Sequence, residues 1–342
     1  GRELVRSPLP SLVTITFAPV SATAYSGGYP TGYGRYDVNT EGEPQRIYED
    51  ARAYGATHMQ QSGTGFVRCF YNYLLTIPFR GVPAVPRLNL ERSEPHLIVD
   101  EQARPGYYST LFPAIDTRME LTVGDHAVAH RYTFATPGVV PYGVPYGVLV
   151  DVTHGGLSSH LARSRAERIE IGLGRGGGHG VFVQQGVTWF FTILALQAPG
   201  GAGPLLWSAD AEPLGGAPVR PNGWLCVDVE EGLERIELGG TECATTRAGV
   251  LWRTSQGSGL DLFVGLSIDS PERATEYSRV AADTGFDGLA AEAENCWDDC
   301  LDRARTRGGD AATRRIFHTA WYHSSLKPAK GESANFIWRD GP

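Results

Sequence analysis

Eleven short β-like runs follow one another between Ser11 and Ser270, separated by Gly, Pro or Asp. Examples are LVTITFAPV (12–20), TWFFTILALQA (188–198) and LDLFVGLSI (260–268). Runs at a spacing of roughly ten residues with turn formers between them are typical of a sandwich or barrel, and not of alternating βαβ units. Glycine and proline contribute 43 and 22 of the 342 residues, which is above average usage. We therefore predict a mainly β fold over this part of the chain.

The period of the apolar residues changes after Ser270. The segment 270–284 begins with Ser270 as a predicted N-cap and Pro271 at the first helical position. The segment 286–307 places its apolar residues at steps of three or four, which predicts one buried helix face. A third helix is predicted to begin at residue 310 and to end before Pro328. Its inward residues are expected to be Ile316, Phe317, Ala320, Trp321 and Ser324.

The β runs and the helices together predict three parts. These are a β-sandwich domain over 1–269, a helical linker over 270–308, and the start of a helical domain over 309–342. The chain opens at Gly1 without an initiator Met, and we expect it to be a piece of a longer polypeptide. The net charge of −8 argues against nucleic acid or an anionic membrane surface as a partner. No run of about 18 apolar residues occurs, so no membrane span is expected.

The five cysteines, at positions 69, 226, 243, 296 and 300, include no Cys-x-x-Cys pair. A zinc ribbon or a thioredoxin-type site is therefore unsupported. Cys226 and Cys243 lie in strand-like stretches and could be bridged, and the alternative is five buried thiols. The number of cysteines is compatible with secretion.

Several motifs carry no function in their context. GLGRGG (172–177) has the letters of a dinucleotide-binding fingerprint, but a strand follows it where that motif needs a helix, so we interpret it as a hairpin loop. Asp151 and His154 follow a hydrophobic strand and are interpreted as a strand-end turn, not a catalytic pair. The carboxylates of Asp298, Asp299 and Asp302 are interpreted as a solvated helix face and not a metal site.

Three stretches, in order, resemble the N-terminal region of glycoside hydrolase family 92, the calcium-dependent exo-α-mannosidases. The first, ARAYGATHMQQSGTG (51–65), resembles a Gly-Phe-Ser-His-x-His-Leu-Ser-Gly-x-Gly loop, with Gln60 in place of the second histidine. The second combines RPGYYS, HRYTF and DVTHGG between residues 104 and 156. The third runs from FVGLSIDSPERATEY (263–277) to RRIFHTAWYHSSLKP (314–328). The family's Gly-rich N-terminal segment is reduced here to GGYPTGYGRYD (27–37).

The resemblance implies a large two-sheet antiparallel sandwich of the galactose-mutarotase-like type, followed by linker helices and the first helix of an (α/α)6 barrel. It further implies an active site between sandwich and barrel. The catalytic acid, the catalytic base and most of the Ca²⁺ ligands would come from the barrel, so no catalytic residue and no metal ligand is named in this chain. The expected partners are a mannose-containing glycan and the remaining helical domain of the same polypeptide.

Two short segments are the predicted sugar-binding residues. Glycine backbones approach a ligand closely, hydroxyl groups hydrogen-bond sugar hydroxyls, and an aromatic ring can stack on a sugar face. The predicted residues are His58, Ser62, Gly63, Thr64, Gly65, Phe66, Arg68, Arg339 and Asp340. The structural alternatives are a Gly-rich strand crossover with a buried His58 and a solvated turn before Gly341-Pro342.

The expected activity is removal of terminal α-linked mannose, with inversion, from N-glycan or mannan-type glycans by a secreted enzyme. One alternative is hydrolysis of a mannosyl phosphate (mannose-1-phospho-6-mannose) linkage, whose leaving group needs little protonation. The other alternative is a non-catalytic carbohydrate-binding sandwich. The amphipathic third helix argues against the isolated module, because its apolar face needs helical partners.

Overall fold

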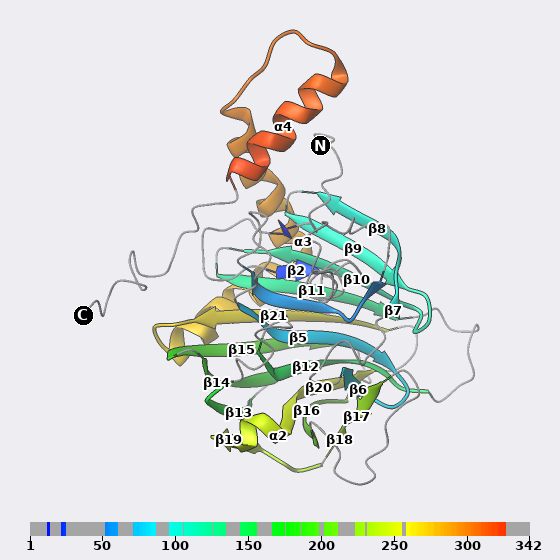
Figure 1. The fold of residues 1–342 in the computed structure, drawn as a ribbon, viewed down its shortest axis with the longest axis vertical. Helices are drawn as coiled ribbons and strands as arrows, with labels where there is room; N and C mark the ends of the chain where they lie inside the picture. Colours follow the sequence, from blue (N-terminus) through cyan, green and yellow to red (C-terminus); the bar gives the residue numbers. More distant parts are fainter. Residues whose placement is uncertain are drawn as a thin grey trace, which may run out of the picture.

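The structure is a computed structural model that describes residues 12–13, 22–24, 52–60, 71–86, 96–104, 106–124, 126–134, 144–155, 166–174, 176–184, 186–197, 202–210, 223–229, 231–254 and 258–325. This part of the chain is mainly β, as predicted, with two long helices at its C-terminal end (Figure 1). Neither helix is both long and apolar enough to cross a membrane.

Two large antiparallel sheets face each other. Within the described residues, one sheet has eight strands in the order β1 (Leu12–Val13), β2 (Ala22–Ala24), β4 (Ala56–Gln60), β5 (Tyr71–Arg80), β12 (Tyr146–Gly155), β20 (Thr246–Thr254), β16 (Ala202–Asp210) and β18 (Asp228–Val229). The other has nine, in the order β19 (Arg235–Gly239), β13 (Arg168–Gly174), β14 (Gly177–Gln184), β15 (Val187–Gln197), β21 (Gly259–Ser267), β11 (Ala127–Phe134), β10 (Thr117–Val123), β9 (Tyr107–Phe112) and β8 (Val99–Arg104). Two short pairs join β6 (Ala84–Pro86) to β17 (Trp224–Cys226) and β3 (Arg52–Ala53) to β7 (His96–Leu97).

The largest apolar core lies between the two sheets and contains residues of both, such as Val150 and Trp252 of one and Trp189 and Leu262 of the other. Alternate residues of each strand point to opposite faces. The residues of the eight-stranded sheet that alternate with these core residues therefore form a second apolar cluster on the outer face of the sheet. Leu149 and Leu251 belong to this cluster, which β6 and β17 cover. Burial on both faces explains why the strand sequences are such continuous apolar runs.

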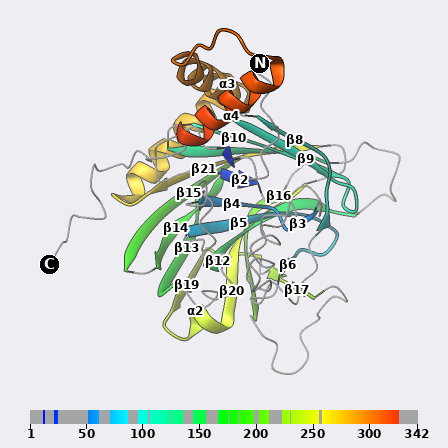
Figure 2. The same cartoon turned by 45° about the horizontal axis from the view of Figure 1, so that its top comes forward.

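Helix α3 (Pro271–Asp302) covers the outer face of the nine-stranded sheet (Figure 2). The backbone N–H of Arg273 donates to Oγ of Ser270 at 3.2 Å, so the predicted N-cap is confirmed. Gly285 has φ 76° and ψ 164° and bends the helix between the two predicted helical segments. The helix also comes very close to β21, because a Cβ on Gly265 would lie 2.2 Å from the carbonyl oxygen of Ala274.

The second half of α3 buries the predicted apolar face, which includes Phe286, Leu289, Trp297 and Leu301. Helix α4 (Ala311–Ser325) lies within the predicted third helix, and it lies beyond the sandwich beside the end of α3 (Figure 1). The prediction that Ile316 and Phe317 point inward is wrong for the described residues, where they are 64% and 39% exposed. Ala320 is exposed as well, whereas Trp321 is half-buried; the side chain of Ser324 lies outside the described part.

The glycine-rich motif and the cysteines differ in how well the sequence predicts them. GLGRGG is a hairpin between β13 and β14, in which Gly174 pairs with Gly177 and no helix follows. Cys226 and Cys243 are free thiols, so the bridge between them is wrong. Cys296 is exposed, against the expectation of a buried thiol. Cys69 and the side chain of Cys300 lie outside the described part.

Candidate functional site

Of the predicted sugar-binding residues, only His58 lies within the described part of the chain. His58 lies in β4. Ser62, Gly63, Thr64, Gly65, Phe66 and Arg68 lie in the segment 61–70, which connects β4 to β5, and Arg339 and Asp340 lie in 326–342; both segments are outside the described residues. Their sugar-binding role stays a prediction. The described neighbourhood of this site is therefore the end of β4, the start of β5 and the strands packed against them.

The pairing of β4 with β5 is interrupted at the level of Leu74. Ala56 pairs with Thr76, whereas His58 pairs with Tyr73, so β5 contains one extra residue. Leu74 has φ 54°, in the left-handed region that side chains with a Cβ rarely adopt. An extra residue that locally disrupts the ladder is a β-bulge, which reorients the side chains on either side of it.

The burial of β5 shows this reorientation. Beyond the bulge, Leu75, Ile77 and Phe79 belong to the outer cluster. Before it, Tyr73 belongs to the core between the sheets, and so does Leu74. With a strict alternation of two, Tyr73 would point to the same face as Leu75. The bulge therefore moves Tyr73 to the inner face, directly after the segment that carries the predicted sugar-binding residues.

A chain of three buried side chains, one from β4 and two from β11 of the opposite sheet, leads to the bulge. Nδ1 of His58 lies 3.0 Å from the carbonyl oxygen of Leu74. Nε2 of His58 lies 2.8 Å from Nε2 of His130 in β11, and Nδ1 of His130 lies 3.1 Å from the hydroxyl oxygen of Tyr132. All three side chains are fully buried. The contacts therefore cross the sandwich from one sheet to the other.

The partners fix the tautomer of each imidazole ring. A carbonyl oxygen only accepts, so Nδ1 of His58 carries the proton and Nε2 of the neutral ring accepts. Nε2–H of His130 must then donate to it, which leaves Nδ1 of His130 to accept from the Tyr132 hydroxyl. The donors thus run in one direction, from Tyr132 through His130 and His58 to Leu74. We call the side chains of Tyr132, His130 and His58 together the histidine relay.

Burial keeps the histidine relay uncharged. Desolvation lowers the pKa of His58 to about 4, opposed by its backbone hydrogen bonds to Leu74 and Tyr73. Desolvation, with a smaller contribution from His58, lowers the pKa of His130 well below its usual value. The pKa of the Tyr132 hydroxyl is raised by burial. At neutral pH none of these groups exchanges a proton readily, so the arrangement favours a positioning function over acid–base chemistry.

His58 is buried, as the structural alternative for this residue expects. Both of its ring nitrogens have protein partners. A hydrogen bond from this ring to a sugar hydroxyl would require one of those partners to leave. His58 is therefore better suited to hold neighbouring backbone in place, and its direct contact with substrate stays a prediction.

Asp151 and His154 do not form a pair. Both lie within β12, so the predicted strand-end turn is wrong. The Asp151 carboxylate forms a buried ion pair with Arg247. Arg247 also donates to Oγ1 of Thr153 at 3.1 Å and to the carbonyl oxygen of Pro86 at 2.9 Å. This network ties β6 to the eight-stranded sheet, which is a structural function.

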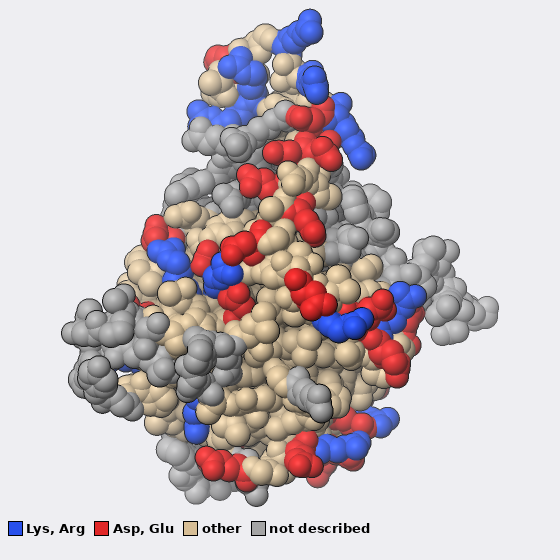
Figure 3. Space-filling model, turned by 180° about the vertical axis from the view of Figure 1, so that it is seen from behind, with Lys and Arg blue, Asp and Glu red and all other residues tan. Residues whose placement is uncertain are grey.

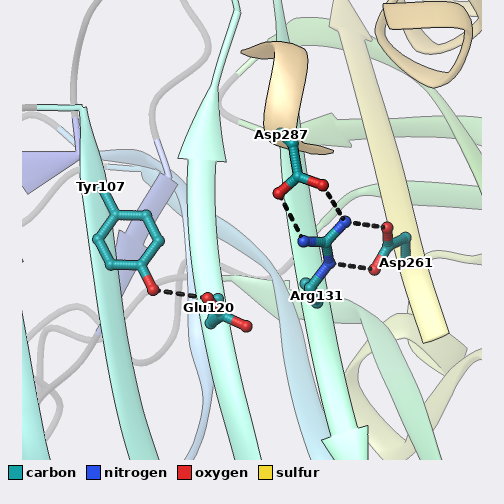
Figure 4. A network of polar contacts seen from close by, with 5 residues as sticks. All are labelled: Tyr107, Glu120, Arg131, Asp261 and Asp287. Carbon is teal, nitrogen blue, oxygen red and sulfur yellow. Dashed lines mark hydrogen bonds and ion pairs between the residues drawn. The ribbon is translucent and has the colours of Figure 1, made fainter. Parts of the chain in front are cut away.

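A polar network on the other side of β11 connects the sheet to α3 (Figure 4). The Arg131 guanidinium donates to both carboxylate oxygens of Asp261 in β21, at 3.1 Å each, and to Asp287 of α3 at 2.7 Å. The same guanidinium lies 4.4 Å from the centre of the Phe286 ring. Arg131 lowers the pKa of Asp287 through a hydrogen bond and its charge. The network fastens α3 directly after its bend at Gly285.

The described residues do not provide a calcium site. No group of three His, Cys, Asp or Glu side chains within them is arranged to hold a metal ion. Asp261 and Asp287, which come close together, are neutralised by Arg131. The carboxylates of Asp298, Asp299 and Asp302 are exposed on α3, where acidic side chains follow the helix (Figure 3). The residues of this chain that are described therefore do not fit Ca²⁺.

The sequence does not single out Leu74, His130 or Tyr132 as residues of one contact network. One signal was present, because alternation places His130, Tyr132 and Phe134 of HRYTF on one face of a strand and Arg131 on the other. Nothing in the sequence, however, indicates that His58 and His130, which are 72 residues apart, meet across the core.

A sequence profile described as the glycosyl hydrolase family 92 N-terminal domain matches residues 20–204, which are 185 of the 342 residues. No curated protein sequence matches the chain.

Two solved structures from Bacteroides thetaiotaomicron are similar in fold. A family GH92 α-mannosidase has 16% identity and a TM-score of 0.63, and the match covers 94% of this chain and 39% of that chain. A family GH92 inverting mannosidase has 13% identity and a TM-score of 0.63, with coverages of 94% and 37%. The chain thus spans about two fifths of the length of these relatives.

Proposed function

The chain belongs to glycosyl hydrolase family 92, and we propose that it is the N-terminal part of an exo-acting glycoside hydrolase that removes terminal α-linked mannose with inversion. The observation that carries the proposal is the family match over more than half of the chain. The similar fold of the two mannosidases supports it. N-glycan or mannan-type glycans outside the cell are the proposed substrates of a secreted enzyme.

The proposal assigns binding, and not proton transfer, to this chain. Inversion requires one carboxyl group that protonates the leaving oxygen and another that activates water, roughly 6.5–9.5 Å apart. Neither group is assigned to this chain. The proposed parts are a sandwich over 1–269 that forms one wall of the sugar site, a linker over 270–308, and the beginning of a helical catalytic domain over 309–342.

Calcium belongs to the proposal as a component held outside the described residues. Ca²⁺ accepts neutral and anionic oxygen ligands at loose geometry, so when bound it can hold two hydroxyls of a terminal mannose. The part of this chain would be to present hydroxyl, amide and aromatic groups to the same sugar.

Hydrolysis of aryl α-mannosides and of α-mannose-terminated glycans by the native polypeptide tests the proposal. We expect release of mannose, appearance of the β-anomer first by ¹H NMR, loss of activity with EDTA and recovery with Ca²⁺. A β-mannoside and an α-glucoside are the matched negative substrates. Activity that survives complete metal removal, or hydrolysis of neither α-mannoside, would refute it. Cleavage of a mannosyl phosphate diester alone, or binding of mannosides without hydrolysis, would identify the two alternatives.

A further inference from the structure

We propose that His130 and Tyr132 are positioning residues, which act through His58 to hold the Leu74 bulge and thereby set the ends of β4 and β5 between which the predicted sugar-binding residues lie. The inference rests on the proposed function for its link to sugar binding. Its structural part, the support of the bulge, stands on the described contacts alone.

The bulge at Leu74 needs support from its surroundings. A residue with a Cβ in the left-handed region costs roughly 1–2 kcal/mol, and such strain persists only where surrounding structure imposes it. Leu74 has this conformation with φ 54°. Its carbonyl oxygen accepts from Nδ1 of His58 at 3.0 Å and from Oγ1 of Thr76 at 3.2 Å. Both donors are buried, so neither bond is exchanged for water.

The register of β5 shifts on both of its sides at the level of Leu74. Against β4 the shift lies between Ala56 and His58. Against β12 the shift lies between Asp151 and Gly155. Bulges are frequent beside active sites, where they redirect side chains. Here the redirected residue is Tyr73, which enters the core immediately after the segment 61–70.

The histidine relay lowers the stability of the folded chain unless all of its hydrogen bonds are formed. Each broken hydrogen bond would leave a buried donor or acceptor without a partner, which costs more than the bond itself contributes. The surrounding core is apolar, with Met119, Val128 and Leu262 among its members. Aliphatic side chains would fill this space without that cost. A complete polar chain instead selects one arrangement, because only the bulged β5 offers the Leu74 carbonyl to His58.

Tyr132→Phe in the native polypeptide is the central test variant. It removes one hydroxyl from the relay and leaves the ring in place. Tyr146→Phe is the matched control, because Tyr146 is equally buried in the same core and its hydroxyl has no hydrogen-bond partner among the described residues. His130→Leu removes the whole link, and His130→Gln restores a donor near the position of Nε2.

Two measurements separate the structural part from the sugar-binding part. Hydrogen exchange of residues 56–60 and 71–76 reports on the bulge without any substrate. For Tyr132→Phe we expect exchange there to be about three- to tenfold faster, and no change for Tyr146→Phe. For an aryl α-mannoside we expect KM to rise about three- to tenfold with kcat within about twofold, since a positioned wall is lost and not a reacting group.

Each outcome decides one part. Equal exchange in Tyr132→Phe and Tyr146→Phe would overturn the support of the bulge. Faster exchange without a change in KM would overturn the link to sugar binding. His130→Gln should lie closer to the wild type than His130→Leu in both measurements, and equal losses would contradict the donor role. No α-mannoside hydrolysis by the wild type overturns the proposed function, while the exchange data still decide the structural part.

Discussion

The left-handed backbone of Leu74 gives a direct test of the bulge in β5. At an ordinary strand position, changing Ala to Gly destabilises by about 0.5–1 kcal/mol through chain entropy and by about 0.8 kcal/mol through the lost methyl burial. With φ 54°, an Ala at position 74 carries roughly 1–2 kcal/mol of strain that a Gly does not. The two effects offset each other. Leu74→Gly should therefore be about as stable as Leu74→Ala.

Leu75 is the matched control position. Both leucines are fully buried in β5, so truncation of either to Ala costs about 2–5 kcal/mol through transfer and cavity formation. Leu75 has no left-handed φ. Its Ala-to-Gly step should cost about 1–2 kcal/mol more than the same step at position 74, and this difference isolates the backbone strain.

The four variants are compared by thermal and urea unfolding followed by tryptophan fluorescence. Trp189 and Trp252 are buried between the sheets and report on the sandwich itself. A difference of about 1–2 kcal/mol corresponds to roughly 2–8 °C between the two Ala-to-Gly steps. An equal cost at positions 74 and 75 would show that Leu74 is not left-handed, and the reasoning from the bulge would fail.

Three further predictions concern stability. Since the pKa of His58 is about 4 when folded and about 6.5 when unfolded, the unfolded chain binds more protons between these values. His58 alone should therefore lower the free energy of unfolding by roughly 3 kcal/mol as the pH drops through that window, and the buried His130 and His154, whose pKa values are also lowered, add to the fall. His58→Gln should lose the His58 part, which denaturant midpoints at pH 7 and 4.5 measure; an identical pH dependence in the variant would contradict it. Arg247→Met leaves the Asp151 carboxylate buried and without its ion-pair partner. This variant should lower the free energy of unfolding by about 3–5 kcal/mol, measured by thermal unfolding. The double variant with Asp151→Leu should recover part of that loss. Ser270→Ala should cost about 1 kcal/mol and Ser270→Gly only a few tenths, because the N-cap bond to α3 is lost; an equal loss would argue against capping.

Local patterns in the sequence were sufficient for most of the fold. Long apolar runs such as 188–198 and 260–268 became β15 and β21, because burial on both faces leaves few polar positions. Strands with mixed composition were missed: β16 contains Gly203-Pro204, and β9 contains Ser109 and Thr110. Their strand conformation depends on neighbours supplied by the sheet, and no local propensity shows it.

The candidate site was less predictable because its contacts are non-local. The two histidines of the relay come from different sheets, and their meeting depends on how the sheets pack. Leu74 has a left-handed backbone that residues with a Cβ rarely adopt, so its own side chain does not predict this conformation. Arg247 is likewise bonded to Asp151, which lies 96 residues away in the sequence. Sequence reasoning identified His58 and Asp151 as notable residues, but their functions depend on partners that only the folded chain shows.

Two consecutive residues of strand β11 make contacts on opposite faces of the nine-stranded sheet. His130 reaches across the core, and Arg131 holds α3 on the outside. A slip of one residue in this strand would place a guanidinium in the apolar interior and an imidazole under the helix at the same time. Substitutions and length changes in β11 should therefore differ in their effect. A substitution of one side chain removes the contacts on one face only, whereas an insertion or deletion of one residue would remove the contacts with α3 and with the bulge together.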